Sequence, residues 1–183
     1  MIATDANILV VMFLDEGASV PVHPETKKPV HRVKDRIVYW IEKLEQDGQK
    51  ILIPTPALSE ILTLAGDPET ASNILMELAG QWVFEIAPFD QVAAVEAAIQ
   101  TIHARNAGSK KGKSLATWAK VKFDRQIVAI AKTRGVTAIY SNDSDVHRIC
   151  KQENIPVFGV WDLPDPPPKQ DPLKFPPPDP DED

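Results

Sequence analysis

The stretch MIATDANILV, residues 1–10, decides the fold of this chain. Ile2 and Ala3 suit a short strand that is buried on both faces, as in a parallel sheet, and Asp5 stands where that strand ends. Ligands of open α/β sheets bind at the carboxyl ends of the strands, so an acid at this position is a candidate site residue. Taken alone, Asp5 is at least as well explained as the cap of a helix that begins at Asn7 or Ile8, a common role for aspartate. Other acids at equivalent strand ends would favour the first interpretation.

Apolar runs and helical patterns alternate along the rest of the chain. Short apolar runs at 50–54, 82–86, 136–140 and 156–160 are typical of buried strands. Segments at 8–14, 33–46, 56–65, 71–78, 91–105, 122–135 and 146–153 are typical of helices. This alternation predicts an α/β fold, a doubly wound sandwich in which helices cover both faces of a central parallel sheet of about five strands. Residues 17–31 contain three prolines and predict a loop.

Length and composition indicate one soluble domain followed by a tail. A chain of 183 residues, 43% of them hydrophobic, is long enough for one domain with a substantial core. Nine of the 17 prolines fall in residues 162–183, together with seven acids and two lysines. We therefore expect a folded domain over 1–161 and a proline-rich acidic tail, extended or disordered, over 162–183. The rest of the chain carries 18 basic and 19 acidic residues, so the net charge of −6 does not exclude a nucleic-acid partner.

Two further features indicate the compartment. No apolar run approaches the ~20 residues needed to cross a bilayer, and the N-terminus lacks the basic and apolar regions of a secretion signal. Cys150 is the only cysteine, so no internal disulfide can form. We therefore expect a cytoplasmic protein without a membrane partner, with Cys150 in or near the core.

Four carboxylates fall where the predicted sheet could bring them together. Asp5 and Asp143 end the first and fourth strands, and they lie side by side if these strands are neighbours. Glu60 and Asp124 each interrupt an otherwise apolar helical run, and Asp145 follows Asp143 by two residues. Each has an alternative role, because Asp5 and Asp143 could be helix caps, Glu60 a surface acid and Asp124 a favourable charge near a helix start. A common site explains all of them at once.

Clustered carboxylates favour a bound cation. Like charges held close together repel one another, and their burial is costly unless a cation neutralises them. Ligand sets made only of oxygen favour Mg²⁺ or Mn²⁺ over zinc. Such an ion lowers the pKa of a bound water and stabilises charge on a phosphate under attack. The predicted chemistry is therefore metal-assisted hydrolysis of a phosphodiester.

Four short motifs follow one another in the order of one nuclease family. They are TDANIL at 4–9, LSEIL at 58–62, FDRQIVAIA at 123–131 and SNDSDV at 141–146. Through them the chain, from its start to about residue 160, resembles the PIN-domain ribonucleases, and within that group the VapC-like toxins of toxin–antitoxin pairs. The resemblance implies a PIN-like doubly wound sandwich and an endoribonuclease that depends on Mg²⁺ or Mn²⁺ and leaves a 5′-phosphate and a 3′-hydroxyl. It also implies an RNA substrate, a small antitoxin partner and a homodimer.

The resemblance further implies roles for individual residues. The catalytic and metal-binding quartet of the family matches Asp5, Glu60, Asp124 and Asp143. Supporting polar positions match Asn7, Ser141 and Asp145, of which Asp145 is also expected among the metal ligands.

A basic segment precedes Asp124 in the sequence. Residues 101–122 contain six lysines or arginines and no acid, and the part from 106 to 113 is polar and contains glycine. A solvated loop and a surface for the RNA backbone explain this charge about equally well. Its place beside the expected acidic crevice supports RNA contacts by Lys110, Lys111, Lys113, Lys120, Lys122 and Arg125.

Two other interpretations stay open. A catalytically silent PIN domain that acts as an RNA- or protein-binding module would have the same fold, but it has no use for converging carboxylates. A receiver-like or phosphatase-like α/β domain also carries acids at strand ends, although receivers need a lysine at a late strand end and residues 156–160 contain none. Dehydrogenase chemistry is disfavoured because no glycine-rich phosphate loop follows the first strand. Absence of tight Mn²⁺ binding would favour the silent module.

Overall fold

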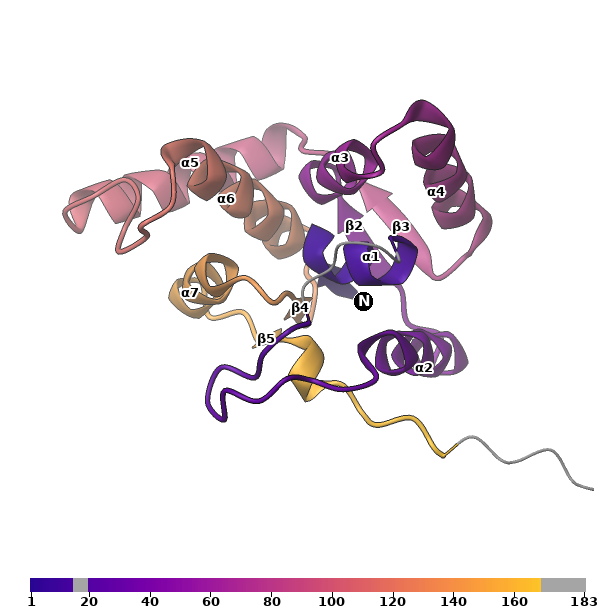
Figure 1. Ribbon diagram of the computed structural model, residues 1–183. Coiled ribbons are helices and arrows are strands. Elements are labelled where there is room, and N and C mark those ends of the chain that lie inside the picture. Colours follow the sequence, from indigo (N-terminus) through magenta and orange to yellow (C-terminus); the bar gives the residue numbers. More distant parts are fainter. Residues whose placement is uncertain (15–19, 169–183) are drawn as a thin grey trace, which may run out of the picture.

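A central sheet of five parallel strands organises the computed structural model, which describes residues 1–14 and 20–168 (Figure 1). The strands are β1 (Ile2–Thr4), β2 (Ile51–Pro54), β3 (Phe84–Ala87), β4 (Ile139–Tyr140) and β5 (Val157–Phe158). Their order in the sheet is β3-β2-β1-β4-β5. The opening stretch of the chain therefore lies at the centre of the sheet with β4 beside it, and the predicted doubly wound fold is confirmed.

Helices cover both faces of this sheet. They are α1 (Ala6–Phe13), α2 (Val33–Gln46), α3 (Thr55–Leu64), α4 (Pro68–Gly80), α5 (Gln91–Asn106), α6 (Trp118–Thr133), α7 (Ser144–Gln152) and a 3₁₀ turn, η1 (Val160–Asp162). Most buried residues of α1 to α4 pack on one face, and most of those of α5 to α7 pack on the other. A small third cluster, Ala6, Ala57 and Ile127, joins α1, α3 and α6. None of the described helices is long and apolar enough to cross a membrane.

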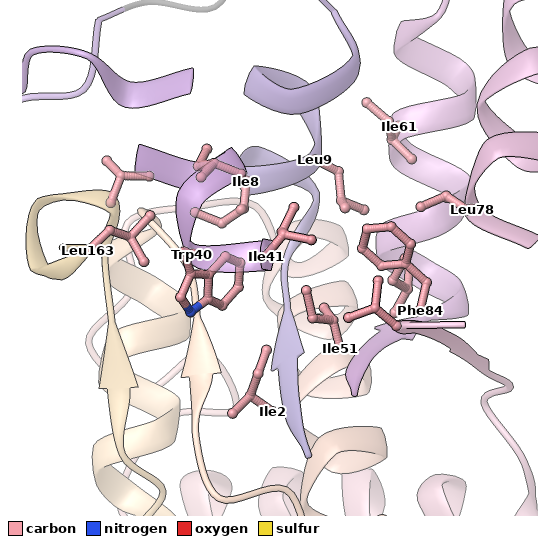
Figure 2. Packing of buried hydrophobic residues seen from close by; sticks show 14 of the residues in the cluster. Ile2, Ile8, Leu9, Trp40, Ile41, Ile51, Ile61, Leu78, Phe84 and Leu163 are labelled. Atoms are coloured by element: carbon pink, nitrogen blue, oxygen red, sulfur yellow. The ribbon is translucent and has the colours of Figure 1, made fainter. Parts of the chain in front are cut away.

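Successive strand residues point to opposite faces of the sheet and fill two cores. Ile51 and Ile53 belong to the first core, under α1, α2 and α4, whereas Leu52 between them belongs to the second, under α6 and α7. Figure 2 shows the first core, in which Trp40 of α2 and Ile8 of α1 lie over the sheet. Cys150 is buried in the second core, as expected from the sequence.

Several helices begin earlier than the sequence pattern predicts, and α6 and α4 differ most. α6 begins four residues before the predicted 122, because the Thr117 hydroxyl accepts a hydrogen bond from the Lys120 N–H and caps the helix. α4 begins at Pro68 rather than at 71, behind its cap Asp67. The earlier start of α6 matters for the site, because it places Lys120 one helical turn before Asp124 on the same face.

The apolar face of α5 points away from the core. Val92, Val95, Ile99 and Ile102 follow one another along this helix and are 40–64% exposed. The buried residues of α5 are Ala93 and Gln100 instead. Helical periodicity predicts such an apolar stripe, but it does not tell whether the stripe faces the core or solvent.

The segments that interrupt the alternation of strands and helices are described in part. Of the predicted loop at 17–31, residues 20–31 are described, and an antiparallel bridge joins Val22 to Pro29. Of the predicted tail at 162–183, residues 162–168 are described. There Leu163 is buried in the first core, and Asp165 forms an ion pair with Arg36. Residues 169–183, and with them most of the predicted tail, lie outside the described residues, as do residues 15–19.

Candidate active site

The register of β1 and β4 brings distant parts of the chain together. Thr4 pairs with Tyr140, and Asp5 therefore lies beside Ser141, 136 residues later in the sequence. The Ser141 hydroxyl donates a hydrogen bond to Asp5 Oδ2 at 2.8 Å, and the Asn7 amide donates a second at 2.7 Å. Asn7 and Ser141, both predicted as supporting residues, thus hold the Asp5 carboxylate in one orientation.

Asp5 and Asp143 are helix caps and also meet at the ends of neighbouring strands. Asp5 Oδ1 accepts a hydrogen bond from the Ala6 N–H, and Asp143 Oδ1 accepts one from the Asp145 N–H, both at 2.7 Å. Each carboxylate keeps its second oxygen for partners from elsewhere in the chain. Asp5 and Asp143 therefore act as helix caps and also lie in the candidate site, the two roles that the sequence left open.

Asp124 faces Asp143 from α6, and Lys120 lies between them. One oxygen from each of Asp124, Asp143 and Asp145 lies within 4.8 Å of the other two. The Lys120 ammonium lies 3.2 and 3.4 Å from the two oxygens of Asp124 and 2.5 Å from Asp143 Oδ2. Three of the predicted acids thus form one group, which we call the acidic group, and a lysine holds two of them together.

Glu60 approaches the acidic group from α3. It remains accessible to solvent and, with Lys120 and Asp124, lines a pocket of about 360 Å³. Partial loss of solvation, followed by the charge of Asp5, raises the pKa of Glu60 above its usual value. Glu60 therefore shares an electrostatic environment with the other predicted acids, from the opposite wall of the crevice.

Burial makes this arrangement of acids costly. Loss of solvation raises the pKa of the Asp5 carboxyl. Burial, together with the neighbouring charge of Asp143, raises the pKa of Asp124 to about 6, in spite of the ion pair with Lys120. Perturbed carboxyl groups of this kind are typical of functional sites. The position of these acids thus costs stability that a simple cap would not cost.

The oxygen donors of the acidic group fit a hard divalent cation. Mg²⁺ and Mn²⁺ prefer carboxylate oxygens, and a cation would relieve the repulsion between Asp124 and Asp143. Asp145 is the least available donor, because two separate side chains, Ser114 and Arg148, each donate a hydrogen bond to one of its oxygens at 2.7 Å. A single flexible side chain, that of Lys120, binds both Asp124 and Asp143. Burial alone would raise the pKa of Asp145, but the hydrogen bonds from Ser114 and Arg148 outweigh burial and hold that pKa below its usual range. Asp124 and Asp143 are therefore the members best placed to hold an ion.

The raised pKa of Asp124 predicts a pH dependence of stability. Its pKa is about 6 in the folded protein against 3.8 in the unfolded chain, so this residue favours the fold below pH 3.8, and the contribution is lost as the pH rises through 6. Asp124→Asn removes that loss. Urea unfolding at pH 4 and pH 7 measures the free energy of unfolding of both proteins. The difference between Asp124→Asn and the unchanged protein should shift by about 2 kcal/mol in favour of the variant from pH 4 to pH 7. A relative loss would mean that the ion pair with Lys120 outweighs burial.

Four of the six basic residues predicted to contact RNA, at 110, 111, 113 and 122, lie in or near the segment between α5 and α6. Lys113 and Lys122 are exposed, and the Lys110 ammonium lies 4.7 Å from the centre of the Trp118 ring. The Lys111 ammonium donates a hydrogen bond to a backbone carbonyl at 2.9 Å. These side chains leave positive charge near the surface of this segment.

The structure does not bring the other two basic residues to that surface. Lys120 binds the acidic group, as described above. Arg125 is 2% exposed, donates a hydrogen bond to Thr101 at 3.1 Å and lies beside the Trp118 ring. Arg125 therefore joins α6 to α5 rather than offering its charge to a ligand.

Three residues near the site were missed by the sequence reasoning. Ser114 connects the basic segment to Asp145. Arg148 and Lys151, both on α7, line a pocket of about 450 Å³ together with Lys113. The run HRICK at 147–151 held the signal for the last two, because Arg148 and Lys151 follow Asp145 at spacings of three residues on one helical face.

Solved structures share this fold, although neither a protein-family model nor a curated protein sequence matches the chain. FitAB bound to a DNA fragment is 20% identical over 90% of this chain and 99% of the matched chain, with a TM-score of 0.54. VapBC2 from Rickettsia felis, bound to a DNA fragment from its promoter, is 15% identical over 87% and 98% of the two chains, with a TM-score of 0.57. VapC20 from Mycobacterium tuberculosis, described as a sarcin–ricin loop cleaving toxin, is 10% identical over 81% and 94%, with a TM-score of 0.53. The chain therefore has the fold of the VapC and FitB PIN-domain toxins, as its four motifs predicted.

Proposed function

We propose that the protein is a cytoplasmic endoribonuclease that depends on Mg²⁺ or Mn²⁺ and acts as the toxin of a toxin–antitoxin pair. The convergence of Asp5, Asp124 and Asp143 where β1 and β4 end, with Glu60 opposite, supports this most directly. Helix capping accounts for Asp5 and Asp143, but Asp124 lies inside α6 and caps nothing. Similarity in fold to a toxin described as cleaving the sarcin–ricin loop agrees with RNA as the substrate.

Each acid has a definite task in this proposal. Asp124 and Asp143 would hold the ion, which supplies a more acidic bound water and neutralises charge on the phosphate. Asp5, fixed by its two side-chain hydrogen bonds, adds a third negative charge at the same strand ends. Glu60, whose pKa is raised, is suited to accept the proton of the attacking water. The water oxygen bonds to phosphorus and its proton passes to Glu60, while the bond from phosphorus to the 3′ oxygen breaks. The leaving 3′ oxygen takes up a proton from solvent, so the products are a 5′-phosphate and a 3′-hydroxyl.

Cleavage of a mixed RNA pool by the purified protein tests the proposal. The reaction is run with Mn²⁺, Mg²⁺ or EDTA, beside Asp5→Asn. Metal-dependent cleavage that disappears in the variant would support both the nuclease and its acidic site, whereas cleavage that survives Asp5→Asn would contradict the site. Absence of cleavage together with absence of Mn²⁺ binding in a titration would favour the silent module instead.

A pocket beside the acidic group supports an antitoxin partner. It measures about 500 Å³ and is lined by Asn7, Glu60 and Asn142 next to apolar residues of α1, α3 and the segment at 20–22. Val20 and Leu64 at this pocket are more than half exposed. An antitoxin segment with apolar side chains would cover these residues and close access to Glu60.

The exposed face of α5 supports a homodimer. Its exposed positions from 91 to 102 are Gln91, Val92, Ala94, Val95, Ala98, Ile99 and Ile102, and none of them carries a charge. Two copies could therefore pair through α5 about a twofold axis without placing like charges opposite each other. Such pairing would also remove the largest row of exposed branched residues on this helix from water.

The basic pocket between α7 and the segment at 107–113 supports a contact with the RNA backbone. We expect Lys151→Glu, made in the Asp143→Asn protein to prevent cleavage, to weaken binding of a short single-stranded RNA. The salt slope of binding should fall by about 0.7 for each phosphate that the variant no longer neutralises. Fluorescence anisotropy between 50 and 200 mM KCl measures both effects. Lys43→Glu is the matched control, because Lys43 is exposed on α2 across the sheet from α7. Equal slopes in both variants would contradict the proposed RNA contact.

A further inference from the structure

Lys120 places a positive charge inside the acidic group. Its ammonium contacts both oxygens of Asp124 and Oδ2 of Asp143. The Lys120 side chain is 46% exposed, whereas that of Asp124 is only 7% exposed. An ammonium group with three hydrogen-bond donors therefore binds the same oxygens that a hard cation would need.

The helix alone does not hold Lys120 in this place. A lysine four residues before an acid is the weaker of the two orders for such a helical pair, and an ordered lysine side chain loses much rotamer freedom. The second carboxylate, that of Asp143, comes from the end of β4 and not from α6. The contact thus belongs to the folded site. Although burial lowers the pKa of Lys120, its bonds to Asp143 and Asp124 hold that pKa above the usual range, so the side chain is charged throughout the physiological range.

We propose that Lys120 is a tethered competitor of the divalent ion, which neutralises Asp124 and Asp143 until an ion binds and then moves to the mouth of the site. This inference rests on the metal-dependent function proposed above. The pocket of about 360 Å³ between α3 and α6, which Lys120 already lines, gives its flexible side chain room to move without displacing α6.

Competition of this kind sets the strength of metal binding. When the binding-competent form is only a fraction of the molecules, the apparent dissociation constant rises by the inverse of that fraction. If Lys120 engages both acids in about nine molecules of ten, removing its charge strengthens Mn²⁺ binding about tenfold. The same lysine limits the repulsion between the acids before an ion binds, so its loss should also lower the melting temperature of the metal-free protein.

Calorimetric titration with Mn²⁺ tests the competition without any assay of activity. Lys120→Met keeps the length of the side chain and removes its charge, and we expect it to bind Mn²⁺ about tenfold more tightly than the unchanged protein. Lys122→Met is the matched control, because Lys122 is an exposed lysine on the same helix outside the acidic group. The Mn²⁺ affinity of this variant should equal that of the unchanged protein. Lys120→Arg keeps the charge and should bind Mn²⁺ with equal or lower affinity. Mn²⁺ should also raise the melting temperature of Lys120→Met more than that of the unchanged protein.

Each outcome decides between specific statements. Mn²⁺ binding that Asp143→Asn abolishes, with equal or weaker affinity in Lys120→Met, overturns the competition and leaves the metal site standing. Mn²⁺ binding that does not depend on Asp143 overturns the proposed metal site and the competition with it. If Lys120→Met does not fold, Lys120→Arg decides, because tighter binding by this charged variant would overturn the competition.

Discussion

Asp143→Asn is expected to lower the rate of RNA cleavage by about 10³-fold or more while the fold stays intact. Asparagine caps helices as well as aspartate does, and its Oδ1 can still accept the Asp145 N–H at the start of α7. It cannot supply the negative oxygen that now binds Lys120 and that the proposed ion requires. Loss of several kcal/mol of transition-state stabilisation corresponds to a factor of this size.

Asp67→Asn provides the matched control for this experiment. Asp67 caps α4 through hydrogen bonds from the Glu69 and Thr70 N–H groups and belongs to a helix outside the acidic group. Single-turnover cleavage with Mn²⁺ reports on the reaction, and thermal unfolding reports on the cap. We expect Asp67→Asn to cleave at the unchanged rate. A rate for Asp143→Asn within tenfold of that of the unchanged protein would contradict the proposed site.

Leu52→Ala is expected to lower the free energy of unfolding by about 3 kcal/mol, the usual cost of a large cavity in a core. Leu52 is fully buried in β2, next to the central strand, and packs with Val128 and Ile130 of α6 in the second core. For a chain of this length the loss corresponds to a fall of roughly 6–12 °C in melting temperature. Urea and thermal unfolding measure the two quantities independently.

A leucine at the other extreme of exposure gives the control. Leu115 is 100% exposed in the segment between α5 and α6, so Leu115→Ala removes the same atoms from water rather than from a core. We expect its free energy of unfolding to change by no more than about 0.5 kcal/mol. Similar losses in both variants would mean that the effect arises from the substitution itself and not from burial in the second core.

The sheet and its acidic edge could be predicted because both depend on local signals. Asp5 and Asp143 directly follow apolar runs, and parallel strands present their carboxyl ends at the same edge. Asp124 interrupts an apolar helical run, so it could be chosen as a candidate site residue without knowing its partners. Their placement agrees with the prediction, whereas their catalytic roles stay predictions until the variants are measured.

The partners of individual charges could not be predicted, because they depend on packing between elements. Lys120 and Arg125 come from the same basic stretch, yet one binds carboxylates and the other is buried beside Trp118. A count of charges along the sequence does not tell which basic side chain binds an acid and which is buried between helices. Asp145 lies in the expected place, but Ser114 reaches it from a segment 31 residues away. The apolar stripe of α5 shows the same limit, because its direction depends on how the helix docks.

The hydrogen bond from Ser141 to Asp5 joins residues 136 positions apart, so the two residues leave the ribosome at different times. Asp5 emerges first, and at typical elongation rates Ser141 and Asp143 follow on the order of ten seconds later. During that interval the growing chain carries Asp5 and Glu60 without the carboxylate that closes the group from β4. A nascent or prematurely terminated chain that lacks β4 therefore cannot assemble the proposed nuclease site. The proposed site therefore forms only after both β1 and β4 have left the ribosome.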